Sequence, residues 1–241
     1  VIAGEIILEN FPLNLISDRK YSRTQETALG NLIADATMAY GKGFVKKPDL
    51  TVINGGGIRA DLNEGKITKG DIIAVLPFGN MYSSIDVTGQ QLIDMFEHSL
   101  RTPMELDENG DYIQNENGTY LLGQNGGFLH VSGARIDYSP FNEPGSRVLG
   151  LFIEVDDGQY EEVDPKGNYV LGTNDFLAFG GDGYNMLGGE RLEGAGLEEV
   201  LIEFLSAKAR FVDLDKYKVQ FPTTRIVQQT FSDATVSSIN E

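Results

Sequence analysis

Three turns that contain glycine or proline hold the residues best suited to binding chemistry. The first turn, residues 54–59, is Asn-Gly-Gly-Gly-Ile-Arg and follows a short β-branched run. Its glycines allow backbone amides to approach a ligand closely, and the guanidinium of Arg59 presents a planar fork of donors that suits phosphate or sugar oxygens. A tight turn with a solvated arginine explains the same residues equally well, so this segment alone leaves both interpretations open.

The first turn also fits a dinucleotide-binding fingerprint, because Gly55, Gly57 and Ala60 match G-x-G-x-x-A after a strand. Its context does not support that interpretation. No long helix opens at this point, and the Asn-Glu-Gly sequence at residues 63–65 interrupts the segment. A Rossmann-type site is therefore not predicted.

The second turn, residues 176–184, is Phe-Leu-Ala-Phe-Gly-Gly-Asp-Gly-Tyr. Phe176 could stack on a base, and the carboxylate of Asp182 could accept hydrogen bonds from a ribose. Considered alone, core phenylalanines beside a turn aspartate are the more common explanation. In the third turn, Leu-Pro-Phe-Gly-Asn at residues 76–80, Phe78 is open to the same two interpretations.

Candidate catalytic and metal-ligating side chains are sparse. The chain contains no cysteine, which excludes a thiolate nucleophile, a disulfide and a Cys-based metal site. It contains two histidines, His98 and His130, far apart in the sequence, and each is predicted to be a surface or packed histidine rather than a ligand. Neither a catalytic metal pair nor a nucleophile elbow for a Ser-His-Asp triad is predicted.

Composition narrows the possible partners. The chain has 241 residues, of which 41% are hydrophobic, and its 19 basic and 36 acidic side chains give a net charge of −17. Such a charge repels phosphate backbones, so nucleic acid is not an expected partner. No apolar run approaches the ~20 residues of a membrane span. The chain begins with Val1 rather than Met, which favours a fragment of a longer protein.

The turns must be positioned by regular elements, which hydrophobic periodicity predicts. Apolar residues at helical spacing indicate helices at about 29–41, 70–75, 89–100 and 197–205, with Thr88 as an N-cap. Strands are expected at 49–54, 82–87, 128–138, 148–155 and 169–173, with antiparallel pairing among the last three. Residues 106–122 are polar and are predicted to form an exposed hairpin or insertion. The irregular interleaving of strands and helices predicts an α+β domain with a mixed sheet.

Six segments occur in a distinctive order: ETALGN at 26–31, NGGGIR at 54–59, LPFGN at 76–80, Thr88-Gly89, Phe96-Glu97-His98 and FLAFGGDGY at 176–184. Together they resemble the C-terminal domain of the 5′-nucleotidase family, which includes ecto-5′-nucleotidases, bacterial UDP-sugar hydrolases and 2′,3′-cyclic-nucleotide phosphodiesterases. The resemblance covers about residues 20–227. The separation of NGGGIR from GGDGY makes this pair specific.

The resemblance implies a layered α/β/β/α sandwich that binds the nucleoside half of a nucleotide. It implies an interdomain connection at residues 1–22, the nucleotide-binding domain at 23–229 and a frayed tail at 230–241. In the family, a preceding metallophosphatase domain holds two divalent metal ions and performs hydrolysis. This chain is therefore expected to contain no cofactor and to be inactive alone. Its partners are a nucleotide or nucleoside and that metallophosphatase domain. The location is expected to be extracellular, periplasmic or cell-wall associated.

By motif position, the resemblance also implies individual roles. Phe78 and Phe176 resemble the two faces of a base sandwich, and Asp182 resembles the partner of the ribose hydroxyls. The remaining candidates are Arg23 and Arg59, which resemble arginines that reach sugar and phosphate oxygens, and Asn54 and Asn80, which resemble polar contacts.

A second hypothesis is a non-catalytic surface or adhesion module that retains the fold without the ligand. The two hypotheses differ in what they require of the candidate residues. A module released from nucleotide binding has no reason to retain Arg23, Arg59, both phenylalanines and Asp182 together.

Overall fold

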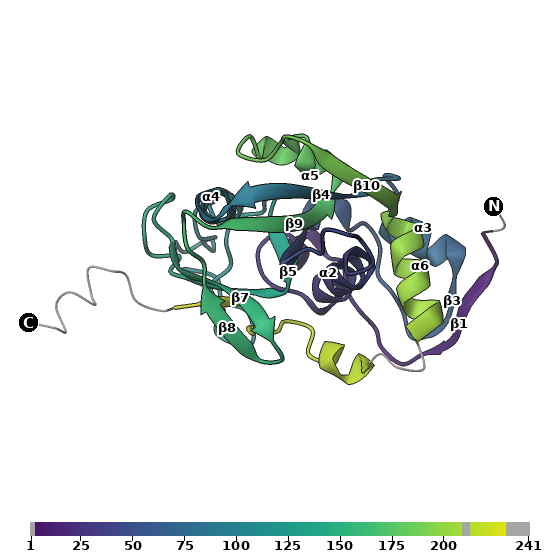
Figure 1. Cartoon of the computed structure of the whole chain (residues 1–241). Coiled ribbons are helices and arrows are strands. Elements are labelled where there is room, and N and C mark those ends of the chain that lie inside the picture. Colours follow the sequence, from purple (N-terminus) through teal and green to yellow (C-terminus); the bar gives the residue numbers. More distant parts are fainter. Residues whose placement is uncertain (1–2, 209–212, 230–241) are drawn as a thin grey trace, which may run out of the picture.

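A five-stranded sheet forms the middle layer of the computed structural model, which describes residues 3–208 and 213–229 (Figure 1). The strands follow the order β10 (Arg191–Gly196), β4 (Met81–Thr88), β9 (Asn168–Asn174), β2 (Leu50–Asn54) and β5 (Leu129–Ser132). Strands β2 and β9 are parallel, and the other neighbours are antiparallel. The prediction of a mixed sheet is therefore confirmed.

Within the described residues, a second sheet has four strands and a third has two. The four-stranded sheet runs β11 (Ile226–Gln228), β6 (Ala134–Tyr138), β7 (Val148–Asp156) and β8 (Gln159–Glu162). The small sheet pairs β1 (Ile6–Phe11) with β3 (Gly65–Thr68).

Local capping chemistry sets several helix boundaries. Thr88 caps α4 with its side chain, and Gln91 reaches back to the Thr88 backbone N–H, so the predicted cap is confirmed. Thr68 and Asp71 form the same reciprocal arrangement at α3. The helices are α1 (Arg19–Ser22), α2 (Ala28–Gly41), α3 (Lys69–Val75), α4 (Gly89–Ser99), α5 (Asp175–Ala178) and α6 (Leu197–Lys208), with 3-10 turns η1 (Gly55–Gly57), η2 (Gly181–Gly183) and η3 (Leu214–Tyr217).

Two hydrophobic cores lie on opposite faces of the five-stranded sheet. One core joins that sheet to the four-stranded sheet and α4, through side chains such as Val52, Met95 and Ile136. The other core joins the sheet to α2, α3 and α6. It includes Ile53 of the sheet and Leu32, Ile72 and Leu201 of the three helices. Figure 1 shows α2 on one side of β9 and β4, with α6 next to α3. This is the predicted layering of helices and two sheets.

One predicted strand, residues 128–138, is wrong because the chain divides it between two sheets. Strand β5 ends at Ser132 in the five-stranded sheet, and β6 begins at Ala134 in the four-stranded sheet. Gly133 between them has φ +78°, and a Cβ there would lie 2.7 Å from the carbonyl oxygen of Asp49. A residue with no side chain therefore allows the chain to change sheets.

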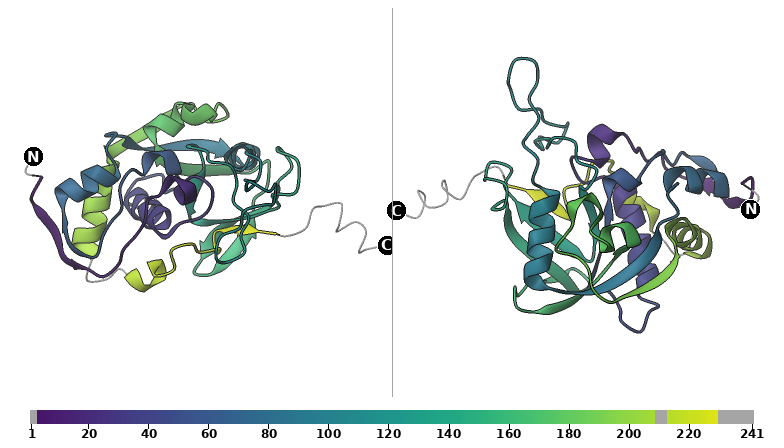
Figure 2. Two further views of the ribbon diagram at one scale, coloured as in Figure 1. Left: turned by 180° about the vertical axis from the view of Figure 1, so that it is seen from behind. Right: turned by 90° about the horizontal axis from the view of Figure 1, so that it is seen from above.

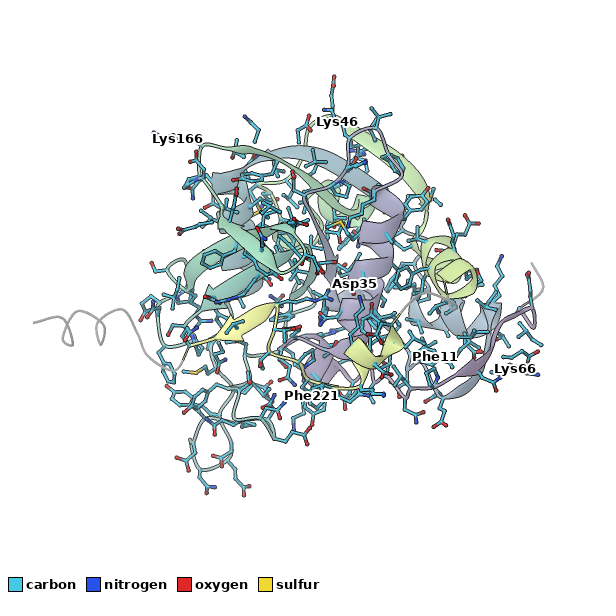
Figure 3. The ribbon with its side chains drawn as sticks, turned by 60° about the horizontal axis from the view of Figure 1, so that its bottom comes forward. Phe11, Asp35, Lys46, Lys66, Lys166 and Phe221 are labelled. Carbon is cyan, nitrogen blue, oxygen red and sulfur yellow. The ribbon has the colours of Figure 1, made fainter. Side chains whose placement is uncertain are left out.

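The two ends of the described chain are attached to the body. Strand β1 lies within the predicted interdomain connection, and Phe11, Leu13 and Leu15 are buried in the second core. The boundary at residue 22 stays a prediction. Near the other end, Arg225 pairs with Asp35 of α2, and Figure 3 shows Asp35 next to this C-terminal segment. The predicted tail at 230–241 lies outside the described residues.

Residues 106–120 are mostly exposed and turn back on themselves, as the predicted hairpin requires, whereas Leu121 and Leu122 are buried. Isolated antiparallel bridges join Leu106 to Tyr112 and Gln114 to Tyr120. Figure 2, seen from above, shows this segment extending away from the body. In the described part of the chain, no helix has both the length and the apolar composition needed to cross a membrane.

Candidate functional site

A cavity of about 410 Å³ lies at the carboxyl ends of the parallel strands β2 and β9. It is lined by Arg23, Asn54, Gly56, Gly57, Arg59, Phe78, Asn80, Gly126, Phe176 and Asp182. The structure thus brings together every site residue that the sequence predicted, from segments far apart in the chain. The roles of these residues in binding stay predictions.

Two phenylalanine rings form apolar walls of the cavity. The exposed fractions are 58% for Phe78 and 42% for Phe176, which excludes the alternative that they are core residues. Asp175 connects the two walls, because its Oδ1 accepts a hydrogen bond of 3.0 Å from the N–H of Met81, just after the Phe78 turn. A Cβ on Gly181 would lie 2.6 Å from the ring of Phe176, so only glycine permits this close packing.

Asp182 presents its carboxylate from a turn with left-handed backbone geometry. Its φ is 53°, a region that aspartate tolerates better than most residues. Asn54 donates from Nδ2 to Asp182 Oδ2 at 3.0 Å, and the ring Nε2 of His98 lies 2.9 Å from the Asp182 carbonyl oxygen. These contacts hold both the side chain and the backbone of Asp182 at the cavity.

Two arginines supply positive charge to the cavity. The guanidinium of Arg59 lies 5.6 Å from the ring centroid of Phe78, and its Nη1 donates to the Gly56 carbonyl at 3.4 Å. Arg23 Nε is buried without a hydrogen-bond partner. Burial lowers the pKa of Arg23, and the positive charges of Arg19 and Arg59 add to this effect, while Asp182 opposes it. An anionic ligand would supply the missing acceptor and relieve this repulsion.

His130 holds the segment that carries Arg23. Burial lowers the pKa of His130 to about 4, so its ring is neutral at pH 7. Its Nε2 lies 2.9 Å from the Ser22 carbonyl, to which it donates because a carbonyl can only accept. Gly55 packs on the same carbonyl, since a Cβ there would lie 1.8 Å from that oxygen. Both histidines are packed residues, as predicted.

The described part of the chain contains no evident metal-binding site. No group of three or more His, Cys, Asp or Glu side chains there could hold an ion. The cavity instead combines flat apolar walls, a carboxylate acceptor and two cationic donors. This set suits a ligand with an aromatic ring, hydroxyl groups and an anionic group.

The sequence analysis did not identify three residues that position the site, namely Asn174, Asp175 and His98. Asn174 ends a strand immediately before a short helix, which is a recognisable N-cap position. Its contact with Asn54 could not be found from local sequence, because the two residues are far apart in the chain.

Comparison with known proteins gives consistent matches. The family model described as "5'-nucleotidase, C-terminal domain" matches residues 8–189. The chain is 36% identical over 172 residues to the trifunctional nucleotide phosphoesterase protein YfkN of Bacillus subtilis (strain 168), and 35% identical over 183 residues to a snake venom 5′-nucleotidase of Crotalus adamanteus. A 5′-nucleotidase precursor from Thermus thermophilus has a similar structure, with a TM-score of 0.71 and 27% identity.

These matches cover most of the chain but a small part of each relative. The alignments cover 71% of this chain and 10% of the Bacillus protein, and 70% of this chain and 28% of the Crotalus protein. The Thermus structure superimposes on 95% of this chain and 40% of its own length. The chain therefore corresponds to one part of larger proteins.

Proposed function

Because the chain belongs to the family of 5′-nucleotidase C-terminal domains, we propose that it recognises the nucleoside half of a nucleotide for a hydrolase of that family. The proposal rests on one observation: Phe78, Phe176, Asp182 and both arginines line the same cavity. Relatives named as nucleotide phosphoesterase and 5′-nucleotidase support nucleotides as the ligand class.

In the proposed complex, the base lies between Phe78 and Phe176. Base–aromatic stacking contributes ~1–3 kcal/mol per contact, and it does not depend on charge. That matters for a domain with a net charge of −17, which repels a nucleotide at long range. Arg59 and Arg23 then lie on the sugar and phosphate side, and Asn80 contacts the base from the Phe78 turn.

Hydrolysis itself is assigned to a preceding metallophosphatase domain that holds two divalent metal ions. We place the parent protein outside the cytoplasm, as an extracellular, periplasmic or cell-wall-associated enzyme, because one relative is a venom protein. The side chains described in this chain offer no cluster fitted to a metal pair. The chain therefore binds the substrate, and its parent performs the reaction.

The chain alone is expected to bind nucleotides weakly and to release no phosphate. Two stacking contacts, offset by lost ligand freedom, predict a dissociation constant on the order of high micromolar to millimolar. Phosphate release from 5′-AMP and UDP-glucose is measured with Mn²⁺, Mg²⁺, Zn²⁺ or Co²⁺ added. Metal-dependent turnover that persists on repurification and disappears in a site variant would refute this assignment.

Replacement of Asp182 by alanine is expected to remove the preference for ribose. A hydrogen bond to a charged group contributes about 1.5–3 kcal/mol, so the wild type should bind a nucleoside about tenfold or more tightly than its 2′,3′-dideoxy form. Calorimetric titration of both ligands measures this ratio, which should fall to near one in Asp182→Ala. An adhesion module would bind neither ligand, and an unchanged ratio would remove Asp182 from the site.

A further inference from the structure

Three polar side chains form a continuous chain of hydrogen bonds that runs from a buried residue to the lining of the cavity. Asn174 Nδ2 donates to Asn54 Oδ1 at 3.1 Å, and Asn54 Nδ2 donates to Asp182 Oδ2 at 3.0 Å. At the other end, Asn174 Oδ1 accepts the N–H of Leu177 at 2.8 Å. Asn174 is only 1% exposed and does not line the cavity, so it acts on a ligand only through its neighbours.

The donor-to-acceptor direction of these hydrogen bonds is fixed by the groups at the two ends, each of which can only donate or only accept. The Leu177 N–H can only donate, so Asn174 must turn its oxygen toward α5 and its amide nitrogen toward Asn54. Asn54 must then present its oxygen to Asn174 and its nitrogen to Asp182. The ionised carboxylate of Asp182 can only accept, which matches the nitrogen it receives. A backbone donor at one end and a carboxylate at the other therefore determine both amide orientations.

We infer that Asn174 is a positioning residue that sets the Asp182 carboxylate for ribose through the amide of Asn54, an inference that rests on the proposed function. Nδ2 of Asn54 donates to Oδ2 of Asp182, and Asp182 lines the cavity. In the proposed complex, Oδ1 of Asp182 then accepts from the ribose. The same Asn174 side chain caps α5, the helix that carries Phe176. One buried amide thus couples the base platform to the ribose acceptor.

The substitution Asn174→Asp isolates this role, because it changes one hydrogen-bonding group and little else. Aspartate is also a good N-cap, so α5 keeps its acceptor for the Leu177 N–H. The second carboxylate oxygen of the new aspartate cannot donate to Asn54, so the Asn54 amide must rotate and donate from its nitrogen to residue 174. The Asn54 oxygen then faces the Asp182 carboxylate, and two acceptors replace the donor–acceptor pair of the wild type.

Binding selectivity gives the functional test. In Asn174→Asp, the tenfold or greater preference for adenosine over 2′,3′-dideoxyadenosine is expected to fall to about twofold or less, whereas the affinity for the dideoxy form changes little. Asn168→Asp adds the same charge at the exposed start of β9 and should leave the preference intact. Full preference in Asn174→Asp would overturn the inference while the proposed function stands. No binding by the wild type would overturn both.

Thermal unfolding tests the coupling of Asn174 to Asp182 without any ligand. In Asn174→Asp/Asp182→Asn, the new amide can donate to the rotated Asn54, so the unfolding temperature should exceed that of Asn174→Asp. Asp182→Asn in the wild-type background is the matched control, because asparagine also tolerates φ 53°, and there it should leave the unfolding temperature unchanged or lower it. An equal change on Asp182→Asn in both backgrounds would show that residues 174 and 182 are not coupled and would refute the hydrogen-bond chain.

Discussion

Replacement of Asp35 by alanine is expected to lower the free energy of unfolding by about 3–5 kcal/mol, because it leaves a buried arginine without its counter-charge. Asp35 lies on α2 and accepts two hydrogen bonds from Arg225, from Nη1 at 2.7 Å and from Nη2 at 2.9 Å. Its carboxylate also accepts from Lys216, Tyr217 and Ser132 at distances of 2.6–2.7 Å. The Asp35 carboxylate thus attaches η3, through Lys216 and Tyr217, and the segment before β11, through Arg225, to α2.

The measurement is urea unfolding of both proteins, with Asp86→Ala as a matched control. Asp86 pairs with Lys46 at the surface, where an ion pair contributes only about 0–1 kcal/mol. A loss in Asp35→Ala no greater than that in Asp86→Ala would contradict the role given to the buried group.

The pH dependence of the same comparison follows from the Asp35 pKa. Burial raises this pKa, but hydrogen bonds and charges from Arg225 and Lys216 outweigh burial and hold it well below its ordinary value. The stabilisation is therefore fully present above the unfolded-state pKa of about 3.9 and is lost as the pH falls through the folded-state value. The difference between wild type and Asp35→Ala should accordingly shrink below about pH 4.

The second large effect is expected when both aromatic walls of the cavity are removed. Phe78→Ala and Phe176→Ala should each weaken nucleoside binding by ~1–3 kcal/mol, and the double variant should show no measurable saturation at millimolar ligand. Both rings are partly exposed, so each substitution should lower the unfolding free energy by only about 1 kcal/mol, and the domain should remain folded. Titration calorimetry and thermal unfolding of the same samples separate the two effects.

Phe179 provides a matched control for these variants. It is 66% exposed, lies three positions after Phe176 and does not line the cavity, and its ring contacts the guanidinium of Arg191. Phe179→Ala should therefore bind as the wild type does. Loss of the thermal transition in Phe78→Ala and Phe176→Ala with binding unaffected would identify both as structural residues.

Local patterns in the sequence were sufficient for the long elements, whereas the contents of the cavity were predictable only from the family resemblance of the ordered motifs. The helix after Thr88 carries its own cap, and the run at residues 50–54 is short, β-branched and lies between Pro48 and three glycines. Phe176 and Asp182 were ambiguous alone, and only the ordered set of motifs made their joint placement predictable. The structure then places them in one cavity with Phe78.

The features that sequence could not supply depend on long-range contacts. Strand β10 was not predicted, because Gly194 and Gly196 weaken the strand signal, and pairing with β4 stabilises it instead. The switch of sheets at Gly133 is visible only when both sheets exist. The amide of Asn174 gains its role through the parallel pairing of β9 with β2, which local patterns do not encode.

The central claim, that this cavity holds a nucleoside, is tested most directly by a crystal structure of the protein with 5′-AMP at millimolar concentration. The predicted electron density shows the base between Phe78 and Phe176, the ribose hydroxyls at Asp182 and the phosphate on the side of Arg59 and Arg23. A nucleotide bound at another surface, with this cavity free of it, would contradict the account.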